Sequence, residues 1–497
     1  MRIRKLQQIA LISVLAFMGS CASIGHHTDA TEGNNFQQTN QLYDDMLNKA
    51  GKANIAQLNL FFTNMPKGGD IHHHYTGSIY AETYLDWVKQ ENWFIDKCTF
   101  KIVMPSETSK CELLTVDALI KDNESYRKLL TLWSDKDYGN HFHDQPPPDS
   151  AFFNTFDYFG PISNENMDIG INIIKQRAIK ENVSYIETML TRVGVKSKSY
   201  FDPEKINNLN ITLRNASTQA EVNTILNKVT GQLSENSEFG AAISNYVSMI
   251  DTLHQGIDND LFMMRYQTYA ARVVDPLSVF MDLYAGYLAA ERSPFVVGVN
   301  IVAPENNHIA LSDYTLHMQM FNYLHSLYPN VNRALHAGEL TTGMVRPKDL
   351  LFHIKQARDI AKAQRIGHGI GLPYEQDSLE LLEDLKQNAA IEINLTSNQF
   401  ILGVKGNEHP YLIYSSYGVP LVISTDDSGV SRNNLTQEYV LLASRYKPSY
   451  GKIKEYVYNS IRYSFLSSAD KITAITLLDK KFVKFESEMA TLYGKLN

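Results

Sequence analysis

Three features of the sequence predict a parallel (β/α)8 barrel. Eight short runs of β-branched and apolar residues alternate with longer segments of helical periodicity. From Val331 onward these runs begin roughly 25 to 35 residues apart, the length of one strand and its helix. Polar residues suited to catalysis follow several runs, and barrel enzymes place their catalytic groups at the carboxyl ends of strands. We therefore expect an α/β protein built on one barrel.

The expected elements follow from this pattern. Residues 34–62 carry apolar positions at helical spacing, which predicts a helical extension over residues 21–64 before a barrel over residues 65–490. The eight predicted strands, in chain order, cover residues 70–74, 184–190, 261–266, 295–302, 331–337, 365–367, 390–395 and 420–425.

The first twenty residues have the pattern of a signal peptide. Three cations within the first five residues precede an apolar run over residues 9–17 that is too short to span a membrane. We expect the chain to be exported, to the periplasm or outer membrane if it is bacterial, and otherwise secreted. The sequence MGSC, which ends at Cys21, loosely resembles a bacterial lipobox, so Cys21 is a candidate lipid-bearing residue. Ordinary cleavage a few residues later is the alternative.

Spacing also predicts two insertions in the barrel. More than 100 residues separate the first two predicted strands, so we expect an insertion at about residues 91–145 after the first strand. Residues 196–249 predict additional helices between later strands. Cys98 and Cys111 lie in the first insertion, and in an exported chain we interpret them as a disulfide that closes a surface excursion. Two free buried thiols are the alternative.

Composition limits the class of partner. The 497 residues are 44% hydrophobic and 11% aromatic, which is enough for a large core. The formal net charge is −8, and no cluster of Lys and Arg follows the first five residues. Because binding to phosphate backbones needs such clusters, the sequence argues against a nucleic-acid partner and predicts a small molecule instead.

Histidines near the start of the barrel indicate a metal site. His72 and His74 are separated by one residue, and on a strand this spacing points both imidazoles to the same face. Gly68 and Gly69 before them and Gly77 after them permit close approach of the backbone. Two imidazoles on one face are half of a metal site, although a surface histidine cluster is an equal alternative on spacing alone.

Further candidate residues follow later strands. The segment LHAGE supplies His336 and Glu339, RIGHG supplies His368, and STDDSG supplies Asp426 and Asp427. Each has a structural explanation by itself, as a buried histidine, a loop histidine or a helix N-cap. Several such endings in one barrel make a shared site at the carboxyl ends of the strands the better interpretation.

The motifs together resemble those of the adenosine deaminase family. MPKGGDIHHHYTG, HAGE, RIGHG, EINLTSN and STDD occur in the order of that family, over roughly residues 35–480. The targeting segment, helical extension and cysteine-containing insertion resemble its secreted adenosine-deaminase-related growth factor branch. This resemblance implies a metal-dependent hydrolase barrel with one zinc ion per subunit. The implied reaction converts adenosine or 2′-deoxyadenosine to inosine or 2′-deoxyinosine and ammonia.

The resemblance also implies a role for each candidate residue. Zinc would be bound by His72, His74, His336 and Asp426. His368 would orient or deprotonate the attacking water, with Asp426 accepting a hydrogen bond from that water. Glu339 would protonate N1 of the purine, and Asp427 would contact N7. In the secreted branch, N-terminal helices of this kind pair two subunits, which makes a homodimer an expectation here.

Two positions depart from the family pattern. Thr76 stands where many members have an Asp that holds the ribose 5′-hydroxyl, and Ala303 stands where a Gly beside purine N3 is usual. These differences favour, as an alternative, another amidohydrolase that acts on a different purine or an N6-substituted nucleoside. A further alternative is a non-catalytic extracellular binding or signalling protein with the same fold.

Overall fold

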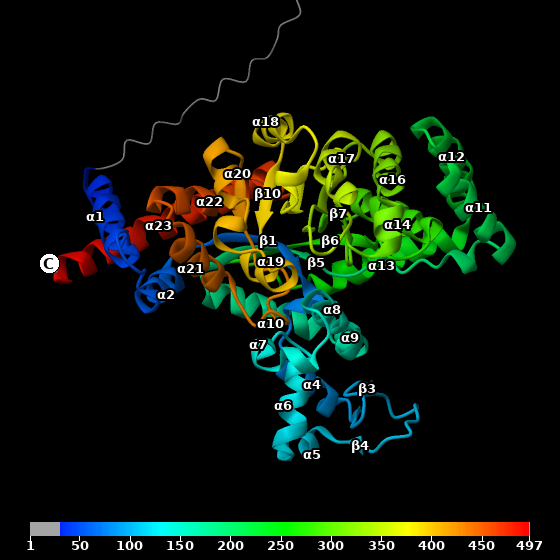
Figure 1. Ribbon diagram of the computed structural model, residues 1–497, viewed down its shortest axis with the longest axis horizontal. Coiled ribbons are helices and arrows are strands. Elements are labelled where there is room, and N and C mark those ends of the chain that lie inside the picture. The colour runs from blue at the N-terminus through cyan, green and yellow to red at the C-terminus, as the bar shows by residue number, and fades with distance from the viewer. Residues whose placement is uncertain (1–29, 497) are drawn as a thin grey trace, which may run out of the picture.

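Eight parallel strands form the centre of the protein (Figure 1). The computed structural model describes residues 30–496, and in it the strands neighbour one another in chain order. They are β1 (Gly68–His74), β5 (Val183–Met189), β6 (Met263–Ala271), β7 (Val296–Val302), β8 (Asn332–Ala337), β9 (Arg365–His368), β10 (Ala390–Ile393) and β11 (Leu421–Ile423). Each overlaps a strand predicted from the sequence, although β6 extends five residues beyond its predicted end, and the (β/α)8 fold is confirmed.

The barrel closes between its first and last strands. The backbone N–H of His74 donates to the carbonyl of Asp426 at 3.2 Å, and the N–H of Asp426 donates to the carbonyl of His72 at 3.0 Å. The carboxylate of Asp70 accepts from both the N–H and the hydroxyl of Thr425, at 3.2 and 2.6 Å. The closing seam therefore places two predicted site histidines next to the predicted site aspartate.

Helices surround the strands and begin where the sequence supplies capping residues. α14 (Pro276–Arg292), for example, has Pro276 in its first turn and Asp275 as N-cap, whose carboxylate accepts from the N–H of Ser278 at 3.1 Å. The other helices that follow the strands are α10 (Met167–Lys180), α16 (Tyr314–Leu327), α17 (His353–Asp359), α18 (Ser378–Asn388), α20 (Tyr411–Tyr417) and α22 (Tyr450–Arg462). Shorter segments at the strand ends are α3 (Tyr75–Ser78), α15 (His308–Ser312) and α19 (Leu395–Leu402).

Two helices precede the barrel, as the sequence predicts. α1 (Ala30–Leu47) packs along the long C-terminal helix α23 (Ser468–Leu496), and α2 (Ile55–Asn64) packs against α21 (Leu435–Tyr446). These helices form one end of the molecule (Figure 1). Within residues 30–496, no helix is both long and apolar enough to cross a membrane. The predicted signal peptide and Cys21 lie outside the described residues.

The insertion after β1 projects away from the barrel (Figure 1). A small antiparallel sheet of β2 (Phe94–Asp96), β3 (Ile102–Val103) and β4 (Leu113–Leu114) carries the disulfide between Cys98 and Cys111, which confirms that prediction. The helix α5 (Val116–Lys121) packs against this sheet, α4 (Ala81–Gln90) and α6 (Asn123–Leu132) pack against α5, and α7 (Tyr138–His141) follows them in the chain.

The chain returns from this insertion to the barrel through two more helices. α8 (Pro148–Asn154) and α9 (Phe156–Glu165), which we call the cap, lie over the carboxyl ends of the strands. The second predicted insertion forms α11 (Pro203–Asn215), α12 (Gln219–Ser234) and α13 (Ser237–Leu253). This insertion lies on the opposite side of the molecule from the N-terminal helices (Figure 1).

Candidate metal and substrate site

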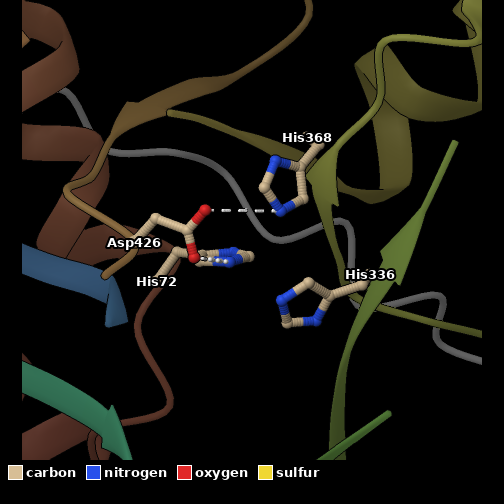
Figure 2. Close-up of side chains that lie close together, drawn as sticks. All are labelled: His72, His336, His368 and Asp426. Atoms are coloured by element: carbon tan, nitrogen blue, oxygen red, sulfur yellow. Dashed lines mark ion pairs between the residues drawn. The ribbon is translucent and has the colours of Figure 1, made fainter. Parts of the chain in front are cut away.

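Four imidazoles and one carboxylate meet at the carboxyl ends of the strands, and Figure 2 shows four of the five side chains. Nε2 of His74 lies 3.2 Å from Nε2 of His336 and 3.3 Å from Oδ1 of Asp426. Nε2 of His72 lies 3.4 Å from the same carboxylate oxygen, and Nε2 of His368 lies 3.8 Å from the other one. The structure thus brings to one point all the histidines singled out at separate strand ends.

Local backbone geometry makes this convergence feasible. His72 and His74 lie two residues apart on β1, so the pleat turns both to the same side. His368 and Asp426 have φ angles of 68° and 61°, a left-handed conformation that costs a non-glycine residue about 1–2 kcal/mol. A Cβ atom at Gly367 would lie 2.6 Å from Cε1 of His72, so glycine is required there. Strain of this kind is typical of functional sites.

The charges of the cluster favour a bound cation. Burial lowers the pKa of His72, but the carboxylates of Asp426 and Glu392 outweigh it and raise that pKa to about 10. Burial also opposes ionisation of Asp426, yet hydrogen bonds from His72 and His74 hold its pKa well below the usual range. A site that holds a proton so strongly also stabilises a metal cation, and imidazoles with one carboxylate suit zinc.

Buried partners orient two of these imidazoles toward the centre. Nδ1 of His72 lies 2.6 Å from Oε2 of Glu392, and Nδ1 of His336 lies 3.0 Å from Oδ1 of Asn300. Because both partner atoms are acceptors, each Nδ1 carries a proton, so Nε2 is the nitrogen of each ring that faces the cluster and would bind a metal. Contacts of this type fix the tautomer of histidines that bind metals.

These partners belong to one continuous series of hydrogen bonds inside the barrel, which runs from His72 to His336 and which we call the polar ring. Arg365 joins Glu392 to Glu187, with Nε and Nη2 at 2.5 and 2.6 Å from the two carboxylates. Gln267 then donates to Glu187 at 2.8 Å and accepts from Asn300 at 3.0 Å. In order, the polar ring consists of His72, Glu392, Arg365, Glu187, Gln267, Asn300 and His336.

In the sequence, Arg365 and Glu392 stand out only as parts of motifs, and three other members of the polar ring were not predicted. Glu187, Gln267 and Asn300 each lie on a barrel strand and are at most 1% exposed. A charged or amide residue within an otherwise apolar strand was the available signal, because such a residue must find a partner inside the barrel.

Glu339 follows β8 and faces His368. Its Oε1 lies 3.5 Å from Nε2 of His368, and burial, followed by the charge of Asp426, raises the pKa of Glu339 well above its usual range. The carboxylate of Glu305 accepts from the backbone N–H groups of Gly338 and Glu339, at 3.1 and 2.8 Å. Glu305 therefore holds the turn that presents a protonated Glu339 to the site.

The cluster opens into a cavity of about 430 Å³, a size suited to a small organic ligand. Asp427 lines it, and burial together with the neighbouring Asp426 raises the pKa of Asp427 well above its usual range. A Cβ atom at Gly77 would lie 1.6 Å from Oδ1 of Asp427, so only glycine leaves room for this carboxyl. The sequence predicted that the backbone at Gly77 is approached closely, and the group that approaches it is the carboxyl of Asp427.

Thr76 and Ala303 also line this cavity. The hydroxyl of Thr76 accepts a hydrogen bond from Ser163 of the cap at 3.3 Å. Ala303 has a φ of 81°, a conformation in which glycine is usual, so the alanine adopts a glycine-like backbone here. Both residues that depart from the family pattern are thus positioned to contact a ligand.

The outer wall of the cavity comes from the cap. Phe152, Phe153 and Phe156 line it together with Met189 of β5. Phe152 also contacts Phe400 of α19, with ring centroids 6.4 Å apart, which joins the cap to the barrel. The cap therefore contributes mostly aromatic side chains to the cavity, and these suit the face of a flat ligand.

Sequence comparison identifies relatives of part of the chain. Residues 264–481, which include β7 to β11, match the family model described as adenosine deaminase. Over 210 residues the chain is 31% identical to the adenosine deaminase of Clostridium acetobutylicum, a match that covers 41% of this chain and 56% of that protein. Over 110 residues it is 36% identical to N6-methyl-AMP deaminase of Homo sapiens, covering 22% and 31%. The chain spans about half the length, or less, of the curated relatives it matches.

Solved structures share the whole fold at low sequence identity. The N6-methyl-AMP deaminase of Arabidopsis thaliana superposes with a TM-score of 0.53 at 16% identity, covering 85% of this chain and 98% of that one. An amidohydrolase from Burkholderia ambifaria with bound zinc gives 0.52 at 15% identity, covering 87% and 94%.

These relatives do not test the resemblance to the secreted growth-factor branch, which stays a prediction. The matched segment contains His336, Glu339, His368, Asp426 and Asp427, and the structure joins them to the two histidines of β1. Residues 264–481 are thus similar to the adenosine deaminase family, and the rest of the barrel shares its fold with the solved structures.

Proposed function

We propose that the protein is a zinc-dependent hydrolase that removes the 6-amino group of adenosine and 2′-deoxyadenosine. One observation carries this proposal: a metal-type donor set, the buried neutral carboxyl of Glu339 and the carboxyl of Asp427 share one cavity. Relatives named adenosine deaminase and a similar barrel described with bound zinc support it.

The metal ligands we propose are His72, His74, His336 and Asp426. The proposal is supported by His72 and His336, whose Nδ1 atoms are held by the polar ring so that their Nε2 atoms face Asp426 and His74. Zinc held there would lower the pKa of a water molecule to about 7 and so supply the nucleophile.

The protein side chains would then handle the protons of the reaction. As the water oxygen adds to C6, Glu339 gives its proton to N1, which lets the ring accept the electron pair. The C6–N6 bond breaks next. Of the two protons that the water brought, one completes the departing ammonia and the other returns to Glu339, and the C6 oxygen becomes a carbonyl. Asp427, which is protonated for the same reason of burial, donates a hydrogen bond to N7. His368 orients the attacking oxygen from the side of Glu339.

The charges around the cavity favour a nucleoside over a nucleotide. Among the described residues that line it, Arg192 is the only arginine or lysine, and its Nη1 lies 3.1 Å from Oδ2 of Asp282. Since Asp282 already pairs this cation, and three carboxyls line the same cavity, a 5′-phosphate would find no unpaired positive charge. This argument favours adenosine over N6-methyl-AMP, the compound in the names of other relatives.

A substrate panel tests the proposal. Adenosine, 2′-deoxyadenosine, adenine, AMP, N6-methyladenosine and N6-methyl-AMP are followed by ultraviolet absorbance and ammonia release, with zinc measured on the same sample. We expect turnover of both adenosines and little turnover of either nucleotide. Absence of turnover with both adenosines would contradict the proposal. Asp282→Asn, which frees Arg192, should raise the activity on AMP relative to adenosine.

A second candidate function is supported by Thr76. Its hydroxyl already pairs with Ser163, and the family aspartate that binds the ribose 5′-hydroxyl is absent. Loss of that contact favours a different purine or an N6-substituted nucleoside as substrate, and the same panel separates these. A purely binding role requires that the protein lack turnover on every member of the panel while it still binds a nucleoside in calorimetry.

Export and assembly are part of the proposal as well. We propose that residues 1–20 are removed and that the mature chain is exported, with Cys21 as a candidate lipid anchor; mass spectrometry of the mature N-terminus tests this. Pairing of two subunits through α1 and α2 is tested by sedimentation of the full chain and of a chain that begins at residue 65.

A further inference from the structure

A chain of hydrogen bonds runs from His368 out of the cavity to a backbone amide. Nδ2 of Asn398 lies 2.8 Å from Nδ1 of His368, and Oδ1 of Asn398 lies 3.1 Å from Nε2 of His409. The backbone N–H of Tyr411 donates to Nδ1 of His409 at 3.0 Å. His368, Asn398 and His409 are all buried, at 2% exposure or less. His409 itself is not part of the cavity wall.

The direction of every bond in this chain follows from its last donor. A backbone N–H can only donate, so Nδ1 of His409 accepts and the ring proton lies on Nε2. Burial, with the charge of Arg445, lowers the pKa of His409 to about 3, so the ring carries that single proton. His409 then donates to Oδ1 of Asn398, which turns the amide nitrogen toward His368. Nδ1 of His368 must therefore accept.

We propose that His409 is a positioning residue that, through Asn398, holds His368 in the tautomer protonated at Nε2. The inference rests on the proposed deaminase function for its catalytic consequence, but the tautomer itself is a property of the fold. The tautomer of His368 also differs from that of His72 and His336, because the partners of those two histidines place a proton on Nδ1. A nitrogen that carries a proton is not a metal ligand, although His368 lies within the same cluster.

This tautomer matters because of what Nε2 of His368 faces. Oε1 of Glu339 lies 3.5 Å away and Oδ2 of Asp426 lies 3.8 Å away. With a proton on Nε2, His368 donates toward these carboxyls and toward an oxygen that enters between them. With a lone pair there, the imidazole would accept a hydrogen bond from the protonated Glu339 and so compete with N1 of the purine for that proton. His368 would thus orient the attacking water rather than deprotonate it.

Two substitutions at His409 of nearly the same shape test the inference. His409→Gln keeps an N–H donor for Oδ1 of Asn398, whereas His409→Glu offers only acceptor oxygens and should turn the Asn398 amide around. The readouts are kcat and KM with adenosine, and the histidine tautomers from two-bond 1H–15N correlations on protein labelled at histidine. The His368 signal is assigned by its absence from His368→Asn.

We expect wild type and His409→Gln to show His368 protonated at Nε2, with kcat within about threefold of each other. For His409→Glu we expect the proton on Nδ1 and kcat lower by about 10- to 100-fold, with KM nearly unchanged, the range found when outer partners of site histidines are lost. The same tautomer in both variants would overturn the inference, as would equal kcat. If His409→Glu does not fold, Asn398→Asp places the same acceptor on Nδ1.

Failure of the proposed function would look different. A protein inactive on every purine of the panel would refute the deaminase proposal, yet the tautomer measurement would still decide whether His409 controls His368.

Discussion

The polar ring supports the cavity from behind, through His336, whereas the cap formed by α8 and α9 lines the cavity directly. Between its two histidines, the polar ring consists of five charged or amide side chains. Each of the five has hydrogen-bond partners and is at most 1% exposed. The cap contributes three phenylalanines and lies outside the segment that matches the family model. The polar side of the cavity is held by hydrogen bonds inside the barrel, whereas the cap side is apolar and follows an insertion in the chain.

This contrast indicates that the polar ring serves the chemical step, whereas the cap serves the choice of substrate. Buried charges in the ring hold one another in place, so histidines directed by the ring keep a geometry that a metal requires. Aromatic contacts in the cap are less directional and accept changes in ligand shape more readily. Substitutions in the barrel should therefore act on kcat and on metal binding, whereas substitutions in the cap should act on KM.

The largest effect is expected at the acid of the reaction. Glu339→Gln removes the proton that we assign to N1 and should lower kcat by about 10²- to 10⁴-fold, the range for general acid catalysis. Because burial raises the pKa of Glu339 and the neutral form is the active one, wild-type kcat should fall as pH rises through that raised value.

Steady-state kinetics over a range of pH, with metal content measured in parallel, checks this prediction. Equal metal content in both proteins would assign the loss to the missing proton. Comparable kcat in the variant and the wild type would exclude Glu339 as the acid.

A smaller effect, on both metal affinity and stability, is expected within the polar ring. Glu392→Gln keeps an acceptor for His72 but leaves the buried Arg365 with one carboxylate partner in place of two. Metal affinity should fall by about 10- to 100-fold, and the free energy of unfolding should fall by about 3–5 kcal/mol. Competition with a chelator and denaturant unfolding measure the two effects. Glu383→Gln, at an exposed position of α18, is the control and should change neither.

Substitution in the cap should sharpen the comparison by leaving kcat almost unchanged. Phe156→Ala removes part of the aromatic wall. Phe156 is half-buried, and a phenylalanine that a ligand covers completely contributes about 1.5–3 kcal/mol, so KM should rise by up to about tenfold. Phe100→Ala, in the insertion that precedes the cap and away from the cavity wall, is the control, because Phe100 is half-buried as well. A large loss of kcat in Phe156→Ala with unchanged KM would mean that the cap takes part in the chemistry.

The smallest effect is expected at Ala303. Its φ of 81° costs a non-glycine residue about 1–2 kcal/mol, and glycine loses about 0.5–1 kcal/mol through its more flexible unfolded chain, so Ala303→Gly should stabilise the protein by up to about 1 kcal/mol. Gly403→Ala is the mirror control, because Gly403 has a φ of 71° with open space around it and should lose stability. Denaturant unfolding of both variants checks the signs.

Much of the fold could be predicted because each strand has a recognisable pattern in its own short stretch of sequence. β11 shows how: Leu421 to Ile423 is a short apolar run, the polar residues Ser424 to Ser428 follow it, and the next segment is helical. The disulfide could be predicted for a related reason, since Cys98 and Cys111 are close in the chain and lie in one polar excursion.

The parts that could not be predicted depend on contacts between distant segments. Glu187, Gln267 and Asn300 belong to three different strands, and nothing in the local pattern says that they join two histidines. The same holds for Glu305, which holds the turn before Glu339, and for His409, whose effect on His368 passes through Asn398.

By itself, the sequence determined the alternation of strands and helices, the histidine pair of β1, and the polar residues that end the other strands, because periodicity and residue chemistry are local properties. Only the tertiary structure decided which imidazole nitrogens face the centre and which carry protons. That choice depends on the partner of the opposite ring nitrogen, and closure of the barrel brings those partners together from strands and loops far apart in the chain.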